Sequence, residues 1–174
     1  MSFSVLVAYA TRYGSTLEVA ETVAATLRED GLKADVQKAQ EVRSLAGYNA
    51  VILGAPLYIS SLEKEARNFL SRHREALAKL PVAIFALGPI HSDEKELQGS
   101  RAQLDKELAR FPWLAPAGIA VFAGKYDPVK LRFPDSLVAK LPASPIYQVP
   151  LSDVRDWAAI RAWAASLPAL FQSA

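Results

Sequence analysis

The chain has 174 residues, of which 51% are hydrophobic and 22% charged, and its formal net charge is +2. Acidic and basic residues are interspersed, which argues against a nucleic-acid partner, and the absence of cysteine excludes disulfides, thiolate metal sites and cysteine nucleophiles, so we expect no bound metal. No apolar run reaches the roughly 18 residues of a transmembrane helix and no signal peptide is apparent, so we expect a single cytoplasmic domain over residues 1–174.

Five stretches are predicted to form β-strands, and four of them are near-continuous apolar runs, which is typical of strands covered on both faces. They are residues 5–10, 33–38, 50–53, 82–87 and 118–123. Helical periodicity lies between them: a helix over residues 15–30, a stripe from Leu62 to Leu77, a stripe from Leu104 to Phe111, and a last helix from about Ser152 that buries Trp157. This alternation predicts an α/β fold, a doubly wound parallel sheet of five strands with helices on both faces.

Residues 127–150 interrupt the alternation with five prolines: Pro128, Pro134, Pro142, Pro145 and Pro150. Proline removes a backbone donor and restricts the preceding residue, so the stretch is predicted to be a loop insertion with a short helix around residues 135–141. This composition is compatible with three roles for the insertion: it could cover a site, dock a partner, or touch a membrane as part of a peripheral protein.

The most informative stretch is the loop between the first strand and the first helix, which contains Thr11, Arg12, Tyr13, Gly14, Ser15 and Thr16. Free N–H groups and the helix dipole favour an anion at such a helix start, and the hydroxyls add further donors. The loop has no lysine, and neither GK[ST] nor GxGxxG is present, which favours a terminal monophosphate over a triphosphate. The alternative is that Ser15 or Thr16 simply caps the helix.

Doubly wound sheets bind ligands at the carboxyl ends of their strands, so the loops after the third and fourth strands are the next candidates. The first is apolar and offers the flat ring of Tyr58 among Ala55, Pro56, Leu57, Tyr58 and Ile59. The second contains Leu87, Gly88, Pro89 and Ile90, where the glycine lets backbone approach a ligand closely. A monophosphate at the first loop with a flat apolar ring between the other two matches flavin mononucleotide (FMN).

Three charged or titratable side chains near these loops are weaker candidates. His91 follows the fourth strand and is a candidate catalytic proton donor, although a lone loop histidine is more often solvated. Lys125 and Arg132 follow the fifth strand, where they either meet an acidic substrate or lie on the surface as solvated charges, and we favour the second reading.

The segment from Ala10 to Thr16 resembles the phosphate loop of the flavodoxin-like superfamily, a T-x-x-G-x-T pattern after the first strand. Residues 48–58, 120–124 and 153–157 resemble one branch of it, the menaquinone-dependent protoporphyrinogen oxidases and related flavodoxin-domain proteins. The resemblance implies the sheet order 2-1-3-4-5 and FMN as the cofactor. It also implies that residues 11–16 hold the phosphate and that residues 56–59 and 87–90 flank the isoalloxazine.

By this resemblance the chain is expected to be an FMN-dependent oxidoreductase of heme biosynthesis, passing electrons from a reduced small-molecule substrate to a quinone or another acceptor. Two alternatives stay open: a flavodoxin-type single-electron carrier that serves a redox protein, and a cofactor-free binding module. Carrier flavodoxins are typically strongly acidic, whereas this chain has a net charge of +2, which favours the enzyme. The donor, the acceptor and the formation of a homo-oligomer are open at this stage.

Overall fold

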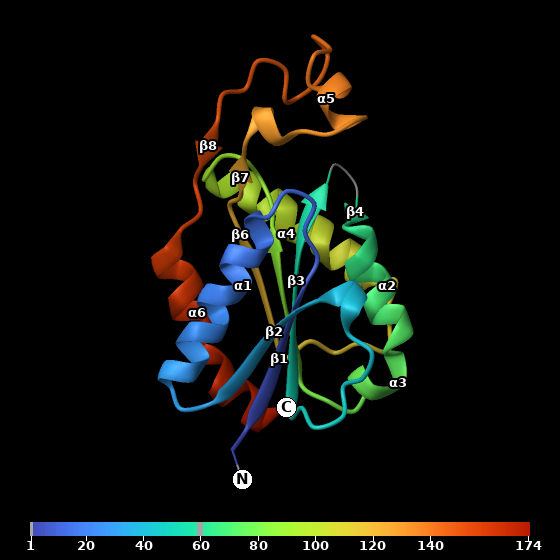
Figure 1. Ribbon diagram of the computed structural model, residues 1–174, viewed down its shortest axis with the longest axis vertical. Helices are drawn as coiled ribbons and strands as arrows, with labels where there is room; N and C mark the ends of the chain where they lie inside the picture. Colours follow the sequence, from blue (N-terminus) through green and yellow to red (C-terminus); the bar gives the residue numbers. More distant parts are fainter. Residues whose placement is uncertain (1, 59–60) are drawn as a thin grey trace.

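The centre of the molecule, seen in a computed structural model that describes residues 2–58 and 61–174, is a parallel β-sheet (Figure 1). Its order is β2-β1-β3-β5-β6, from β1 (Ser4–Tyr9), β2 (Lys33–Lys38), β3 (Ala50–Tyr58), β5 (Val82–Leu87) and β6 (Gly118–Phe122). These are the five predicted strands in the predicted order. The numbering differs because β4 (Ser61–Leu62) adds a short antiparallel strand beside the end of β3.

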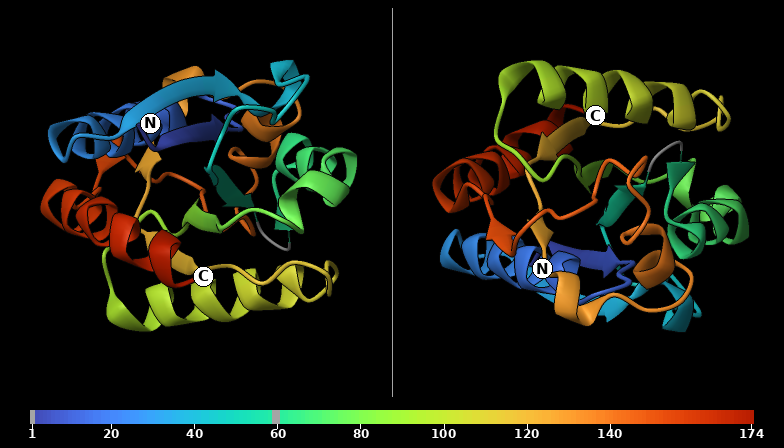
Figure 2. Two further views of the ribbon diagram at one scale, coloured as in Figure 1. Left: turned by 90° about the horizontal axis from the view of Figure 1, so that it is seen from below. Right: turned by 90° about the horizontal axis from the view of Figure 1, so that it is seen from above.

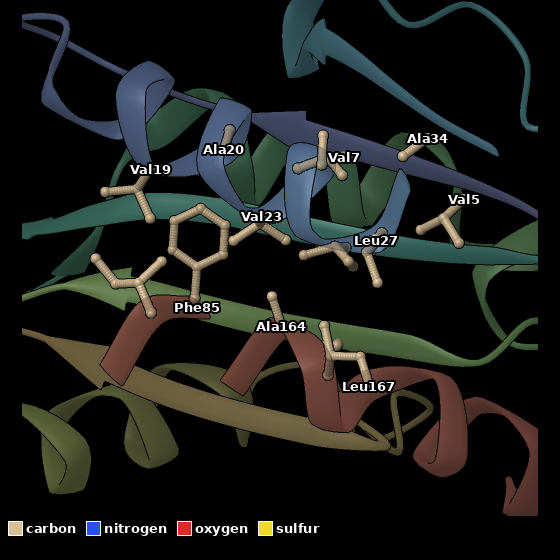
Figure 3. Close-up of a cluster of buried hydrophobic side chains, with 14 of the residues drawn as sticks. Val5, Val7, Val19, Ala20, Val23, Leu27, Ala34, Phe85, Ala164 and Leu167 are labelled. Atoms are coloured by element: carbon tan, nitrogen blue, oxygen red, sulfur yellow. The ribbon is translucent and has the colours of Figure 1, made fainter. Parts of the chain in front are cut away.

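Helices cover both faces of the sheet (Figure 2). On one face α1 (Ser15–Glu29) and α6 (Trp157–Ser173) pack on the strands, and Figure 3 shows Val19 and Val23 of α1 beside Phe85 of β5. On the other face lie α2 (Lys64–Arg72), α3 (Arg74–Leu77) and α4 (Glu94–Leu108). Burial on both faces explains why the central strands are apolar at nearly every position, and the α/β prediction is confirmed.

Two predicted boundaries are wrong, one at the end of β3 and one in the helical segment that follows it. The third strand does not end at Leu53, because β3 continues to Tyr58, with Pro56 opposite Leu87 of β5 and Leu57 opposite Leu62 of β4. Its apolar "loop" is therefore the end of a strand. The stripe from Leu62 to Leu77 is also not one helix, since it breaks at His73 between α2 and α3.

The last helix begins at Trp157, later than predicted. Asp156 caps it by accepting a hydrogen bond from the N–H of Ala159 at 3.0 Å. The preceding residues form a strand instead, because β8 (Ser152–Asp153) pairs with β7 (Lys125–Tyr126), a long-range partner that local periodicity does not reveal. Trp157 is only partly buried, and its ring stacks on the guanidinium of Arg155.

The β7–β8 pair closes the base of the proline-rich insertion. The insertion contains a 3-10 turn, η2 (Pro128–Lys130), and a short helix, α5 (Asp135–Val138), which ends earlier than predicted; a further turn, η1 (Ala39–Glu41), follows β2. In Figure 1 the insertion, coloured orange, lies beyond the carboxyl ends of the strands. Within the described residues no helix combines the length and the apolar character needed to cross a membrane.

Candidate functional site

A cavity of about 740 Å³ lies at the carboxyl ends of β1, β3 and β5. Four segments supply its walls: the phosphate loop, the β3–β4 hairpin, the residues after β5 and the insertion. The predicted site residues that line it are Arg12, Tyr13, Ser15, Pro56, Leu57, Tyr58, Leu87, Gly88, Pro89, Ile90 and His91. The three predicted loops are thus brought together at one place, as the strand order requires.

The other predicted site residues are not among those that line the cavity. Thr11 and Gly14 are half-buried in the phosphate loop, Thr16 is buried at the start of α1, and Ala55 is buried within β3 opposite Ala86. Ile59 lies outside the described residues. The contribution of each residue to flavin binding stays a prediction.

The phosphate loop has the geometry of an anion site. Gly14 precedes α1 with a φ of 90°, a left-handed conformation that favours glycine, and its N–H donates to Oγ1 of Thr11 at 2.8 Å. No side chain of the described residues caps α1, which counts against simple capping by Ser15 or Thr16. Thr16 is fully buried, and its Oγ1 has no hydrogen-bond partner within the described chain. An orphaned hydroxyl beside the free N–H groups of a helix start fits a phosphate.

Arg12 does not leave a free positive charge in this loop. Its guanidinium forms an ion pair with Asp135 at 3.2 Å and lies 5.7 Å from the ring centroids of both Tyr13 and Tyr58. The hydroxyl of Tyr13 donates to the same carboxylate oxygen. Burial, followed by this hydrogen bond, raises the pKa of Tyr13, and burial raises the pKa of Tyr58. Both phenols therefore stay protonated at neutral pH and can donate hydrogen bonds.

The insertion forms one wall of the cavity, which agrees with one of the three roles left open by its composition. Its apolar contribution comes from Leu131, Val138, Pro145 and Ile146, and its polar contribution from Asp127, Lys130 and Asp135. Lys125 and Tyr126 of β7 also line the cavity. The apolar residues between the prolines were the available signal, but Asp135 and its partner Tyr13 are 122 positions apart and no local pattern connects them.

Arg155 holds the base of the insertion against the start of α1. Its side chain is 2% exposed, and Nη2 lies 2.7 Å from Asp153 and 2.8 Å from Glu18. Nη1 donates to the backbone carbonyl of Ser15 at 3.2 Å. The hydrogen bond from Arg155 lowers the pKa of the Asp153 carboxyl. The segment 153–157 carried part of the resemblance to the oxidase branch, and this contact gives it a structural role.

The charged candidates lie at the rim. The His91 side chain is 62% exposed, with Nδ1 3.5 Å from a carboxylate oxygen of Glu96, so its catalytic role stays a prediction. Lys125 lines the cavity, whereas Arg132 is exposed.

The strand order and the phosphate loop together define a flavodoxin-like protein. The flavodoxin domain family matches residues 6–144, and the chain belongs to that family. Flavodoxin domains bind FMN, which confirms the predicted cofactor at the level of the family.

One curated relative and two solved structures illustrate the range of similar proteins. Protoporphyrinogen IX dehydrogenase [quinone] of Escherichia coli K12 is 27% identical over 139 residues, 78% of this chain and 76% of the relative. A flavodoxin of Streptococcus pneumoniae TIGR4 is similar in fold, with a TM-score of 0.57, 20% identity and coverage of 95% of this chain and 98% of that one. Rubredoxin oxygen:oxidoreductase of Desulfovibrio gigas has a TM-score of 0.56 at 12% identity, and the match covers 98% of this chain but only 36% of that one. The flavodoxin-like resemblance is thus confirmed, and the two structures support the fold alone.

Proposed function

We propose that the protein is an FMN-dependent oxidoreductase of the protoporphyrinogen IX dehydrogenase type, acting in heme biosynthesis from the cytoplasm as a single domain. It takes electrons from a reduced organic substrate and passes them to a quinone or another acceptor. The name of the relative from Escherichia coli supports the reaction class, and the phosphate loop supports the cofactor.

The observation that carries the proposal is the cavity to which the insertion contributes one wall. A single-electron carrier needs only an exposed flavin edge that a partner protein can approach. Here the insertion adds Leu131, Val138 and Ile146 to the walls of a cavity of about 740 Å³, a size typical of small-molecule sites. Such a cavity is suited to an organic substrate held against the cofactor.

The residues divide the work between binding and shielding. The N–H groups at the start of α1 and the hydroxyls of Thr11 and Thr16 would hold the phosphate. Pro56, Leu57 and Tyr58 on one side, with Leu87–Ile90 on the other, would hold the ring. The flavin would supply the redox chemistry when bound. The protonated phenol of Tyr58 can donate a hydrogen bond to a polar group in the cavity, whereas the Tyr13 hydroxyl already donates to Asp135. The apolar side chains of the insertion would reduce the access of water to the ring.

Two measurements on the FMN-loaded protein test the proposal. The first is anaerobic oxidation of protoporphyrinogen IX with a soluble menaquinone analogue, followed by porphyrin fluorescence, with protein-free and quinone-free controls. We expect quinone-dependent turnover, and turnover equal to the protein-free rate would refute the substrate. The second is a spectroelectrochemical titration, in which the enzyme is expected to take up two electrons in one step.

A single-electron carrier is the second candidate, and membership of the flavodoxin domain family favours it. It predicts two well-separated one-electron steps in the same titration and efficient reduction of a redox protein. A chain that binds no FMN at all would refute both functions and support a binding module.

A quinone acceptor further suggests contact with a membrane surface. The large hydrophobic side chains that are exposed in the described residues all lie in or next to the insertion: Val129, Phe133, Leu137, Leu141, Tyr147 and Leu151. We propose that this outer face touches the lipid surface in which quinones dissolve.

A further inference from the structure

We propose that the insertion is a strap that closes over the FMN site and that Asp135 is its latch, positioning Arg12 and Tyr13 of the phosphate loop and slowing the release of FMN. This inference rests on the FMN binding of the proposed function. It assigns a role to a carboxylate that the sequence pattern does not identify.

The latch is a contact between two segments far apart in the sequence. Oδ2 of Asp135, at the start of α5, accepts a hydrogen bond from the Tyr13 hydroxyl and lies 3.2 Å from Nη2 of Arg12. One carboxylate oxygen therefore serves two consecutive residues of the phosphate loop. All three side chains line the cavity, so the contact crosses its rim.

The two ends of the strap differ in how firmly they are held. At the base, the Arg155 side chain is 2% exposed and is bound to both Asp153 and Glu18. At the tip, the side chains of Arg12 and Asp135 are 37% and 27% exposed. Water competes for a partly exposed ion pair far more effectively than for a buried one. The tip is thus the end that opens, while the base stays attached to α1.

Closure of the tip of the insertion is expected to slow the exchange of FMN. With the tip in place, Leu131 and Ile146 form part of the cavity wall, and Arg12 lies between the rings of Tyr13 and Tyr58. The latch residues line the same cavity, so the contact would cover part of a ligand whose phosphate lies at the start of α1. Its dissociation should therefore become faster when the latch is removed.

Because Asp135 is charged, the direction of the change in the FMN dissociation rate distinguishes two explanations. If the carboxylate did nothing but add negative charge near a bound phosphate dianion, its neutralisation would relieve repulsion and slow FMN release. The latch predicts the opposite, because the neutral side chain loses the ion pair and the charge-assisted hydrogen bond. The direction of the change in dissociation rate separates the two explanations.

The experiment measures the rate of FMN dissociation from the reconstituted protein by the recovery of flavin fluorescence. The variants are Asp135→Asn, Tyr13→Phe and the double variant. We expect each single change to raise the dissociation rate roughly five- to thirtyfold, with the double variant no faster than the faster single one, since both remove the same contact. Asp30→Asn, the same charge change at the far end of α1, and Lys140→Ala, elsewhere in the insertion, should leave the rate unchanged.

A slower or unchanged rate in Asp135→Asn overturns the latch, as do additive effects of the two single changes. If even the unsubstituted chain binds no FMN, the proposed function fails and limited proteolysis of the chain decides the latch by itself. Cleavage within residues 127–150 should then be faster in Asp135→Asn than in the unsubstituted chain. Equal cleavage rates would overturn the strap.

Discussion

Replacing Thr16 with valine tests whether the phosphate loop is built for its ligand at the expense of the chain's own stability. The Thr16 side chain is fully buried, and its Oγ1 has no partner in the described residues. An unsatisfied buried hydroxyl costs about 1–3 kcal/mol, and valine has nearly the same shape. We expect Thr16→Val to raise the free energy of unfolding of the FMN-free protein by about 1 kcal/mol.

The same substitution should weaken FMN binding, because a hydrogen bond to a charged phosphate is lost. Such a bond contributes about 1.5–3 kcal/mol, equivalent to roughly a ten- to hundredfold rise in Kd. Urea unfolding with an unchanged m-value measures the first effect, and fluorescence titration with FMN measures the second. A phosphate-binding role for the Thr16 hydroxyl requires that stability rises while the affinity for FMN falls.

Thr26→Val is the matched control. Thr26 is a buried threonine of the same helix, but its hydroxyl donates to the carbonyl of Thr22 at 2.9 Å. This variant should not gain stability and should bind FMN as the unsubstituted protein does. If Thr16→Val instead loses stability and keeps its affinity for FMN, the hydroxyl is an ordinary core contact and the argument fails.

Four further expectations follow from the fold. Arg155→Met should lower the free energy of unfolding, measured in urea, by about 2–3 kcal/mol and should weaken FMN binding, because it frees the start of α1 from the base of the insertion. We call these contacts of Arg155 with Asp153, Glu18 and Ser15 the Arg155 clamp, and a loss below about 0.5 kcal/mol would refute it. Gly54→Ala should cost about 1–3 kcal/mol in the same assay, since the new Cβ would lie 1.9 Å from the Phe85 ring, and Phe85→Leu should partly restore it. Burial lowers the pKa of His73, so the unfolded state binds the proton more tightly, and stability should fall as the pH drops below about 6.5; His73→Phe should flatten this slope. Phe133→Ser should reduce co-sedimentation with anionic lipid vesicles, and equal sedimentation would count against membrane contact by the insertion.

The central strands were predictable because they are covered on both faces. Residues 82–87, for example, are all buried in β5, so their apolar run carried the information directly. The end of β3 was not predictable from the sequence. Gly54 and Pro56, considered by themselves, indicate a turn after Leu53. Only the register with Leu87 of β5 and Leu62 of β4 shows that the backbone stays extended there.

The candidate site divides in the same way between local and distant information. The phosphate loop was recognisable because its hydroxyls, its glycine and the helix after it are contiguous in sequence. The contacts that surround it were not: the pairing of β7 with β8, the Arg155 clamp and the Asp135 latch all join residues that are far apart in the chain. Segment composition indicated an insertion but did not indicate where its tip would lie.

The start of α1 differs from the starts of the other long helices, α2, α4 and α6, each of which has a side-chain cap. Helices α4 and α6 are preceded by aspartate caps, Asp93 and Asp156, whereas Gly14 precedes α1 and provides no side-chain cap. The buried Thr16 hydroxyl lies just inside α1. Local rules are broken at functional sites when a ligand supplies what the chain omits. The unsatisfied groups at the start of α1 are those that a phosphate would satisfy, and Arg155 and Asp135 hold that loop from both ends of the insertion. FMN binding and closure of the insertion are therefore expected to stabilise each other.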